Sequence, residues 1–353
     1  MATTPESDAP AGRWPALAAT AVGSMPGTDV REATSVVLGE LEVPHLPELP
    51  LRGAGADLVG RTAALLSGVS ADLGVSTTTD GWRLAGAPGR DVRRAVAWLG
   101  EDLDTLAELA DGYQGPLTVA LAGPWTLAAS LELASGERAL RDAGACRDLA
   151  EALAEAAARH VRDVARRVPG AAVQLQLDEP SLTAVAEGSV PTASGWSRLR
   201  VPGTEELVTR LAHVVAAGRE AGAGVLVHSC AARPRYDVLL ARDLRRAGLG
   251  GWSFDLRLHH QRDDEPLGEL LDAGVRLVLG VLPVDTSDAS VVADSVRLVQ
   301  QWSYRLGADL DATAGLLAVS PTCGLAGASP AGARATLAAT AEVARLLRQE
   351  VRP

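Results

Sequence analysis

The sequence of 353 residues contains no lysine, asparagine or isoleucine, one phenylalanine and only three cysteines. The missing residues have codons rich in A and T, so we attribute their absence to a GC-rich genome rather than to mechanism. Three cysteines cannot form the disulfide framework of a small secreted protein. The sequence also lacks an apolar run of about 18 residues and an apolar leader, which predicts neither a membrane span nor a secretion signal. We therefore expect a cytoplasmic protein that has no membrane partner.

Charge of one sign is not concentrated anywhere in the chain. Arginine is the only basic residue apart from histidine, and the arginines are scattered among the acidic side chains, with a net charge of −11. This pattern argues against a nucleic-acid partner and favours a small-molecule ligand. Hydrophobic residues make up 47% of the chain, which is typical of a globular enzyme. Residues 1–15 are expected to form a disordered tail, and residues 16–353 one domain.

From about residue 17 onward, short apolar runs alternate with longer amphipathic stretches. This alternation predicts repeated βα units around a parallel sheet. The segment around Trp82 is expected to be irregular. The expected strands are 17–24, 43–49, 117–122, 172–177, 225–227, 252–254, 276–281 and 316–319. Helical segments include 29–42, 57–66, 91–111, 145–168, 204–221, 291–306 and 330–347. The fold class predicted by this count is α/β, a single closed (β/α)8 TIM barrel.

Polar and ligand-type side chains follow most of these strands. Barrel enzymes place their active sites at the carboxyl ends of the strands, so these side chains are expected to converge there. Core packing does not explain such a pattern. In chain order the candidates are Gly23, Ser24, Glu48, Asp178, Glu179, His228, Cys230, Asp255, Asp285 and Cys323.

Four of these candidates have the chemistry of a zinc site. His228, Cys230 and Cys323 offer one nitrogen and two sulfurs, and Asp255 offers an oxygen, which together would complete a tetrahedron. Two thiolates, a neutral imidazole and a carboxylate give such a site a net charge of about −1, which suits the activation of a thiol substrate. The alternatives are that Cys323 is a small core residue and that Asp178 and Glu179 cap a helix or pair with arginine.

Four motifs occur in order, each after an expected strand: Val22-Gly23-Ser24, Leu177-Asp178-Glu179-Pro180, His228-Ser229-Cys230 and Ser320-Pro321-Thr322-Cys323-Gly324-Leu325. Together they resemble the catalytic, C-terminal half of cobalamin-independent methionine synthase, from about residue 17 to 347. The resemblance implies a zinc barrel, of the type shared with uroporphyrinogen decarboxylase, that acts in methionine biosynthesis. The family binds zinc through a histidine, two cysteines and a glutamate. His228, Cys230 and Cys323 match these ligands, and Asp255 stands at the glutamate position.

The same resemblance implies how homocysteine, the thiol substrate, is bound. Ser24, with the backbone of its neighbour Gly23, would hold the carboxylate of homocysteine. Asp178 would take the ammonium group, assisted by Glu48.

The sequence departs from the long members of the family on the side of the methyl donor. Ser130 stands where those enzymes have a tryptophan that stacks on the pterin, and Trp125 is displaced. Asp285 takes roughly the place of a histidine proton donor, so Asp285 or Glu179 would manage a proton. Short single-barrel relatives of the actinobacterial and archaeal type share these departures and are thought to take methyl from a corrinoid.

The function predicted from this resemblance is a zinc-dependent S-methyltransferase. It would form methionine from homocysteine, with methyltetrahydrofolate or a methylated corrinoid, free or protein-bound, as donor. Two alternatives stay open from the sequence. One is a metal-free barrel lyase of the uroporphyrinogen decarboxylase type. The other is a non-catalytic paralogue that binds a thiol or an amino acid.

Overall fold

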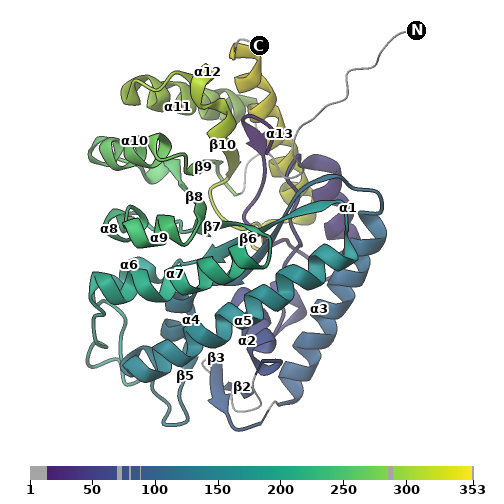
Figure 1. Ribbon diagram of the computed structural model, residues 1–353. Helices are drawn as coiled ribbons and strands as arrows, with labels where there is room; N and C mark the ends of the chain where they lie inside the picture. The colour runs from purple at the N-terminus through teal and green to yellow at the C-terminus, as the bar shows by residue number, and fades with distance from the viewer. Residues whose placement is uncertain (1–13, 70–73, 79–80, 88, 285–288, 352–353) are drawn as a thin grey trace.

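Seven parallel strands form one curled sheet in the order β1-β10-β9-β8-β7-β6-β4 (Figure 1). The computed structural model describes residues 14–69, 74–78, 81–87, 89–284 and 289–351. These strands are β1 Ala18–Ala19, β4 Gly115–Ala122, β6 Ala171–Asp178, β7 Gly224–His228, β8 Leu249–Asp255, β9 Arg276–Leu282 and β10 Leu317–Pro321. Their valine, leucine and alanine side chains are buried on both faces, as a parallel sheet covered by helices requires. Seven of the eight expected strands therefore form, although β1 is much shorter than expected.

The expected second strand is irregular, yet it closes the ring. Glu48 N–H donates to the carbonyl of Gly23 beyond β1 (3.1 Å), and Leu46 N–H donates to the carbonyl of Thr118 in β4 (2.9 Å). The prolines inside this segment lack the N–H groups that a continuous ladder needs. The segment and the seven strands together complete the predicted barrel.

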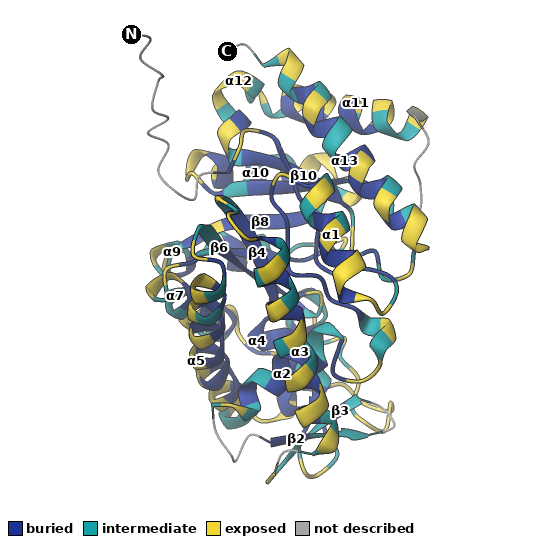
Figure 2. Ribbon diagram, turned by 90° about the vertical axis from the view of Figure 1, so that its right-hand side faces the viewer, coloured by how far each residue is buried: buried dark blue, intermediate teal, exposed yellow. Residues whose placement is uncertain are grey.

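Helices cover the outside of the ring, and Figure 2 shows their buried faces turned towards the strands and their exposed faces turned outwards. Several begin where a side chain accepts backbone N–H groups: Asp29 at α1, Asp57 at α2, Asp142 at α5 and Ser329 at α13. The helices are α1 Val30–Glu40, α2 Leu58–Ser67, α3 Arg90–Leu109, α4 Pro124–Ser130, α5 Ala143–Arg167, α6 Leu182–Ala186, α7 Thr204–Glu220, α8 Tyr236–Leu239, α9 Arg242–Arg246, α10 Asp264–Asp272, α11 Ala289–Leu306, α12 Leu310–Thr313 and α13 Pro330–Glu350.

A small second sheet lies beside the barrel, below α2 in Figure 1. Strands β2 (Gly74–Thr78) and β3 (Gly81–Ala85) pair antiparallel, and β5 (Leu131–Glu132) pairs parallel with β3. The expectation that Trp82 lies in an irregular stretch is wrong, because Trp82 belongs to β3 and is buried. Its indole packs against α2 at Gly60, where a Cβ atom would lie 2.7 Å from the ring.

The amino-terminal end of the barrel is covered by Trp14. This indole is 3% exposed, and the guanidinium of Arg276 lies 4.9 Å from its ring centroid. Trp14 clusters with Ala18, Val43 and other buried side chains. The packed barrel therefore already includes Trp14. Residues 1–13 lie outside the described part of the chain.

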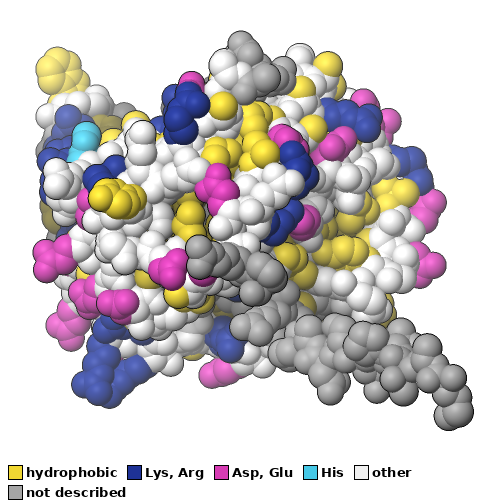
Figure 3. Space-filling view, turned by 90° about the horizontal axis from the view of Figure 1, so that it is seen from above, with side chains coloured by type: hydrophobic (Ala, Val, Ile, Leu, Met, Phe, Trp, Pro, Cys, Tyr) yellow, Lys and Arg dark blue, Asp and Glu magenta, His cyan; other side chains and the backbone are white. Residues whose placement is uncertain are grey.

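The outer surface carries charges of both signs. Figure 3 shows acidic and basic side chains interspersed across the face seen from above. Ion pairs on the surface include Arg345 with Glu342 (2.6 Å) and Arg334 with Glu40 (2.9 Å). No helix in the described ranges is long and apolar enough to cross a membrane.

Candidate active site

A cavity of about 330 Å³ lies at the end of the barrel where the strands finish. Its wall collects side chains from distant parts of the chain. Ser24 follows β1, Asp178 and His228 end β6 and β7, and Cys323 follows β10. The other lining residues are Val22, Glu48, Pro50, Asp57, Leu58, Val59, Pro180, Cys230 and Gly324. This is the rim at which barrel enzymes carry their active sites.

Two thiols meet in the wall of the cavity. The sulfur atoms of Cys230 and Cys323 are 3.8 Å apart. Hydrogen bonds from Cys230 and from the backbone N–H of Gly324 lower the pKa of Cys323 to about 6. The same contact with Cys323, together with burial, raises the pKa of Cys230. The pair therefore favours one thiolate and one thiol near neutral pH.

The imidazole of His228 lies in the same wall and is buried. Its Nδ1 is 2.9 Å from the hydroxyl of Ser253 in β8, which orients the ring and leaves Nε2 as the nitrogen available to a ligand. Burial lowers the pKa of His228 to about 4. The ring is therefore neutral at physiological pH, as a metal ligand must be.

The spacing of the two sulfurs and the chemistry of the three donors fit zinc. Two sulfurs on a tetrahedral zinc lie about 3.8 Å apart, because each Zn–S bond is about 2.3 Å long. Asp255 fits less well, since it does not line the cavity and its Oδ1 accepts the backbone N–H of Arg257 (2.8 Å). Within the described residues, no group of three or more His, Cys, Asp or Glu side chains is close enough together to hold a metal ion. The structure thus brings together two of the four predicted ligands, with the imidazole in the same wall.

Ser24 lies where three segments meet. Its carbonyl accepts the N–H of Leu325 (2.8 Å), and its backbone pairs with that of Glu48. Its hydroxyl packs on Gly324, where a Cβ atom would lie 2.1 Å from it. The preceding Gly23 has a φ of +145°, a conformation that favours glycine. These backbone contacts hold Ser24 at the rim of the barrel.

Two buried carboxyl groups, Glu48 and Asp178, complete the predicted substrate residues. Burial raises the pKa of Glu48 to about 7, against the opposing effect of the Arg61 guanidinium. Burial, and then the neighbouring charge of Glu48, raise the pKa of Asp178 well above its usual range. Both side chains line the cavity. The cavity thus offers two carboxyl groups whose charge a cationic ligand would stabilise.

Glu179, the next residue in the motif, points elsewhere. Its Oε1 accepts the backbone N–H of Trp125 (2.9 Å), and its Oε2 accepts the N–H and hydroxyl of Thr126 (both 2.8 Å). Gly123 leaves room for this carboxylate, because a Cβ atom there would lie 2.4 Å from Oε1. Glu179 is fully buried and does not line the cavity. Its bonds to the first turn of α4 favour a structural role over the predicted proton transfer.

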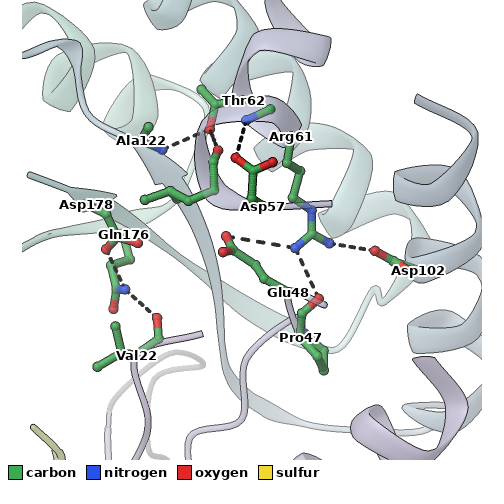
Figure 4. A network of polar contacts seen from close by, with 12 residues as sticks. Val22, Pro47, Glu48, Asp57, Arg61, Thr62, Asp102, Ala122, Gln176 and Asp178 are labelled. Carbon is green, nitrogen blue, oxygen red and sulfur yellow. Dashed lines mark hydrogen bonds and ion pairs between the residues drawn. The ribbon is translucent and has the colours of Figure 1, made fainter. Parts of the chain in front are cut away.

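Gln176 is a residue of the site that the sequence analysis missed. Its Nε2 donates to the carbonyl of Val22 (2.6 Å) and to Oδ1 of Asp178 (2.8 Å), as Figure 4 shows. A signal was present, because Gln174, Gln176 and Asp178 alternate in an otherwise apolar strand and so share one face. Arg61 and Asp102, also drawn in Figure 4, gave no such signal.

The predicted residues on the donor side are placed less completely. Asp285 lies outside the described residues. Trp125 is buried, and its indole N–H donates to the carbonyl of Leu207 (3.0 Å). Trp252 is also buried and stacks on Phe254 with ring centroids 4.3 Å apart. Both tryptophans are therefore core residues, and Trp125 does not take the place of the tryptophan that stacks on the pterin in the long enzymes.

Comparisons with known proteins agree with this geometry. A family model described as the catalytic domain of cobalamin-independent synthase matches residues 107–346. No curated protein sequence matches the chain significantly. The solved structure of a B12-independent methionine synthase from Shewanella sp. W3-18-1, in complex with selenomethionine, is 15% identical, with a TM-score of 0.59. That match covers 95% of this chain and 98% of the other, and it shows the shared fold.

Other solved structures are less similar. KGPDC from Streptococcus mutans is 11% identical with a TM-score of 0.34, over 71% of this chain and 82% of that one. An intracellular xylanase from Thermoanaerobacterium saccharolyticum is 12% identical with a TM-score of 0.36, over 85% and 91%. These lower scores add nothing to the assignment. Because the family model spans more than half of the sequence, the chain belongs to the cobalamin-independent methionine synthase family, in the part that forms the catalytic domain.

Proposed function

We propose that the chain catalyses zinc-dependent methyl transfer to the thiol of homocysteine and so forms methionine. The observation that carries the proposal is the pair of sulfurs of Cys230 and Cys323, 3.8 Å apart. They share one cavity with the neutral imidazole of His228 and with two buried carboxyl groups. A cavity of about 330 Å³ also suits a small amino acid.

His228, Cys230 and Cys323 would hold the metal, with Asp255 as the proposed fourth ligand. Zinc, when bound, would lower the pKa of a thiol substrate so that it reacts as a thiolate. The chain prepares this site by orienting the imidazole through Ser253 and by favouring a thiolate at Cys323. Asp255 lies near enough to raise the pKa of Cys323, which supports its place at the edge of the site.

The remaining cavity residues would hold the amino-acid end of homocysteine. Ser24 and the backbone at Gly23 would bind the carboxylate, and Asp178 and Glu48 would bind the ammonium group. Contacts at both charged groups would hold the sulfur in line with the methyl group, and such positioning is a main source of rate in two-substrate reactions.

The donor would be methyltetrahydrofolate or a methylated corrinoid, either free or carried by a protein, and the reaction would take place in the cytoplasm. Asp285 is the proposed group for a proton on the donor side. Glu179 is a weaker candidate for this step, because both of its oxygens already accept hydrogen bonds from Trp125 and Thr126.

Metal analysis of the purified protein tests the proposal directly. We expect about one zinc per chain in the wild type, a large loss in Cys323→Ala, and no loss in the matched variant Cys146→Ala. Cys146 is a suitable control because it is buried in α5, and its sulfur contacts Arg200 rather than the cavity. No zinc in the wild type would discard the mechanism and favour the metal-free lyase.

Methionine formation is the second measurement. Zinc-loaded protein is incubated with homocysteine and each candidate donor in turn, and the product is quantified. We expect methionine with one of the donors. Tight homocysteine binding without turnover on any donor would instead mark a binding protein, for which the hydrogen-bonded position of Asp255 would then be the structural cause.

A further inference from the structure

One carboxylate oxygen in the cavity wall has no hydrogen-bond partner among the described residues. It is Oε1 of Glu48, whose side chain is buried. A buried polar atom without a partner is costly, so its persistence at a cavity wall points to a ligand that supplies the missing donor. The nearest cation that the described chain offers is Arg61, whose Nη1 lies 4.0 Å from this oxygen.

Arg61 is held back from Glu48 by other bonds (Figure 4). Its Nη2 donates to Oδ2 of Asp102 at 3.0 Å, and its Nη1 donates to the carbonyl of Pro47 at 3.1 Å. Asp102 is fixed in turn, because its Oδ1 accepts a hydrogen bond of 2.7 Å from Arg52. All three charged side chains are at most 8% exposed. The guanidinium is thus close enough to act on Glu48 through its charge, but too far away to donate a hydrogen bond to Oε1.

We propose that Arg61 and Asp102 are positioning residues for Glu48: Arg61 favours its ionised form, and Asp102 keeps it free to bind an ammonium group. In this arrangement Arg61 supplies the positive charge that favours the carboxylate. Asp102 keeps Arg61 at the 4.0 Å ion-pair distance, so that the guanidinium does not hydrogen-bond to Glu48. The identity of the cation, the ammonium of an amino-acid substrate, rests on the proposed function. The control of the charge of Glu48 by Arg61 and Asp102 does not depend on the proposed function.

The other charged groups around Glu48 are acidic and disfavour its ionised form, which Arg61 favours. Asp57 just before α2, Asp102 on α3 and Asp178 on β6 are all acidic, and the first two raise the pKa of Glu48. Arg61 opposes them and opposes burial. Loss of Arg61 would therefore leave Glu48 protonated at neutral pH. Loss of the Asp102 charge would act in the opposite direction, because it removes a negative neighbour and frees Arg61 to approach.

Arg61→Gln and Asp102→Asn are therefore expected to shift the pKa of Glu48 in opposite directions. A merely structural role of the two residues would not produce this difference. Carboxyl carbons of glutamate are labelled with 13C in the full chain, and the Glu48 resonance is assigned by its loss in Glu48→Gln. We expect the titration midpoint of Glu48 to rise by at least one pH unit in Arg61→Gln and to fall in Asp102→Asn. Arg200→Gln serves as the control, since Arg200 pairs with Glu206 away from the cavity, and it is expected to leave the midpoint unchanged.

Equal midpoints, or shifts in the same direction, would overturn the inference. If Arg61→Gln does not fold, Asp102→Asn decides alone, and a midpoint that stays or rises rejects the role.

Binding of the ligand is measured separately by calorimetry. L-homocysteine is compared with 4-sulfanylbutanoate, which lacks only the ammonium group. We expect both variants to lose at least tenfold in affinity for homocysteine and to bind the analogue as the wild type does. Wild-type affinity for homocysteine in both variants would reject the positioning role. Failure of the wild type itself to bind homocysteine would defeat the proposed function, while the titration would still decide whether Arg61 and Asp102 control Glu48.

Discussion

Glu48 and Glu179 are two buried glutamates with the same shift in pKa and opposite surroundings. Glu48 is 4% exposed and Glu179 is 0% exposed. Burial raises the pKa of both to about 7. The carboxylate of Glu179 accepts three hydrogen bonds from the start of α4, whereas Oε1 of Glu48 accepts none from the described residues.

The difference shows that a raised pKa alone does not mark a functional group. At Glu179 the chain supplies its own donors, so the carboxylate serves the fold by holding α4 against the end of β6. At Glu48 no described residue donates a hydrogen bond to Oε1, and the side chain lines a cavity. The missing partner, rather than the shifted pKa, indicates a place for a ligand.

The largest expected effect tests the structural half of this comparison. Glu179→Gln keeps the shape of the side chain but turns an amide NH2 towards backbone N–H groups of α4. We expect the free energy of unfolding at pH 4, where Glu179 is largely protonated and its ionisation does not enter the comparison, to fall by roughly 1–3 kcal/mol, because buried donors lose an acceptor. Urea unfolding followed by circular dichroism measures this change. An unchanged midpoint would show that α4 does not depend on Glu179.

The same substitution at Glu48 is expected to have the opposite sign. The folded pKa of about 7 lies above the ordinary value of 4.5, so the folded state binds the proton more tightly than the unfolded state. Stability is then full below about pH 4.5 and is lost as the pH rises towards 7. We expect Glu48→Gln to raise the free energy of unfolding by about 2 kcal/mol at pH 8.5 and to change it little at pH 4. A variant that is less stable than the wild type at pH 8.5 would contradict the comparison.

The smallest effect concerns ligand affinity. L-Methionine has an ammonium group but no thiol that titrates, so its binding reports on the carboxyl groups. We expect its affinity to rise about tenfold between pH 6 and pH 8, as Glu48 loses its proton through a pKa of about 7. Calorimetry at several pH values measures the trend. Glu48→Gln should bind weakly at every pH, and a flat profile in the wild type would remove Glu48 from the ammonium site.

The sequence predicted the barrel and the convergence of its rim residues because both depend on local patterns. Apolar runs mark the strands, and residues that follow parallel strands meet at one end. His228, Cys230 and Cys323 accordingly lie around one cavity. Motif spacing could not show which way a side chain turns. Oδ1 of Asp255 accepts the backbone N–H of Arg257, a contact that its position in the sequence did not indicate.

Contacts between distant elements were the other part that the sequence could not provide. Arg61 and Asp102 are 41 residues apart on two helices, and each alone is typical of a solvated charge. The hairpin of β2 and β3 was missed because its buried contact, between Trp82 and Gly60, depends on how α2 packs. These features follow from tertiary packing, which overrides local propensity.

The irregular segment that closes the barrel also carries Glu48, and this joins two properties of the molecule. Its backbone hydrogen bonds, among them those to Gly23 and Thr118, are isolated contacts rather than a continuous ladder, so we expect the ring to open more easily at this boundary than between regular strands. Ser24 lies on one side of this boundary and Glu48 on the other. An amino acid that binds Ser24 by its carboxylate and Glu48 by its ammonium group would hold the two sides together. Occupancy of the site would then set how tightly the ring is closed.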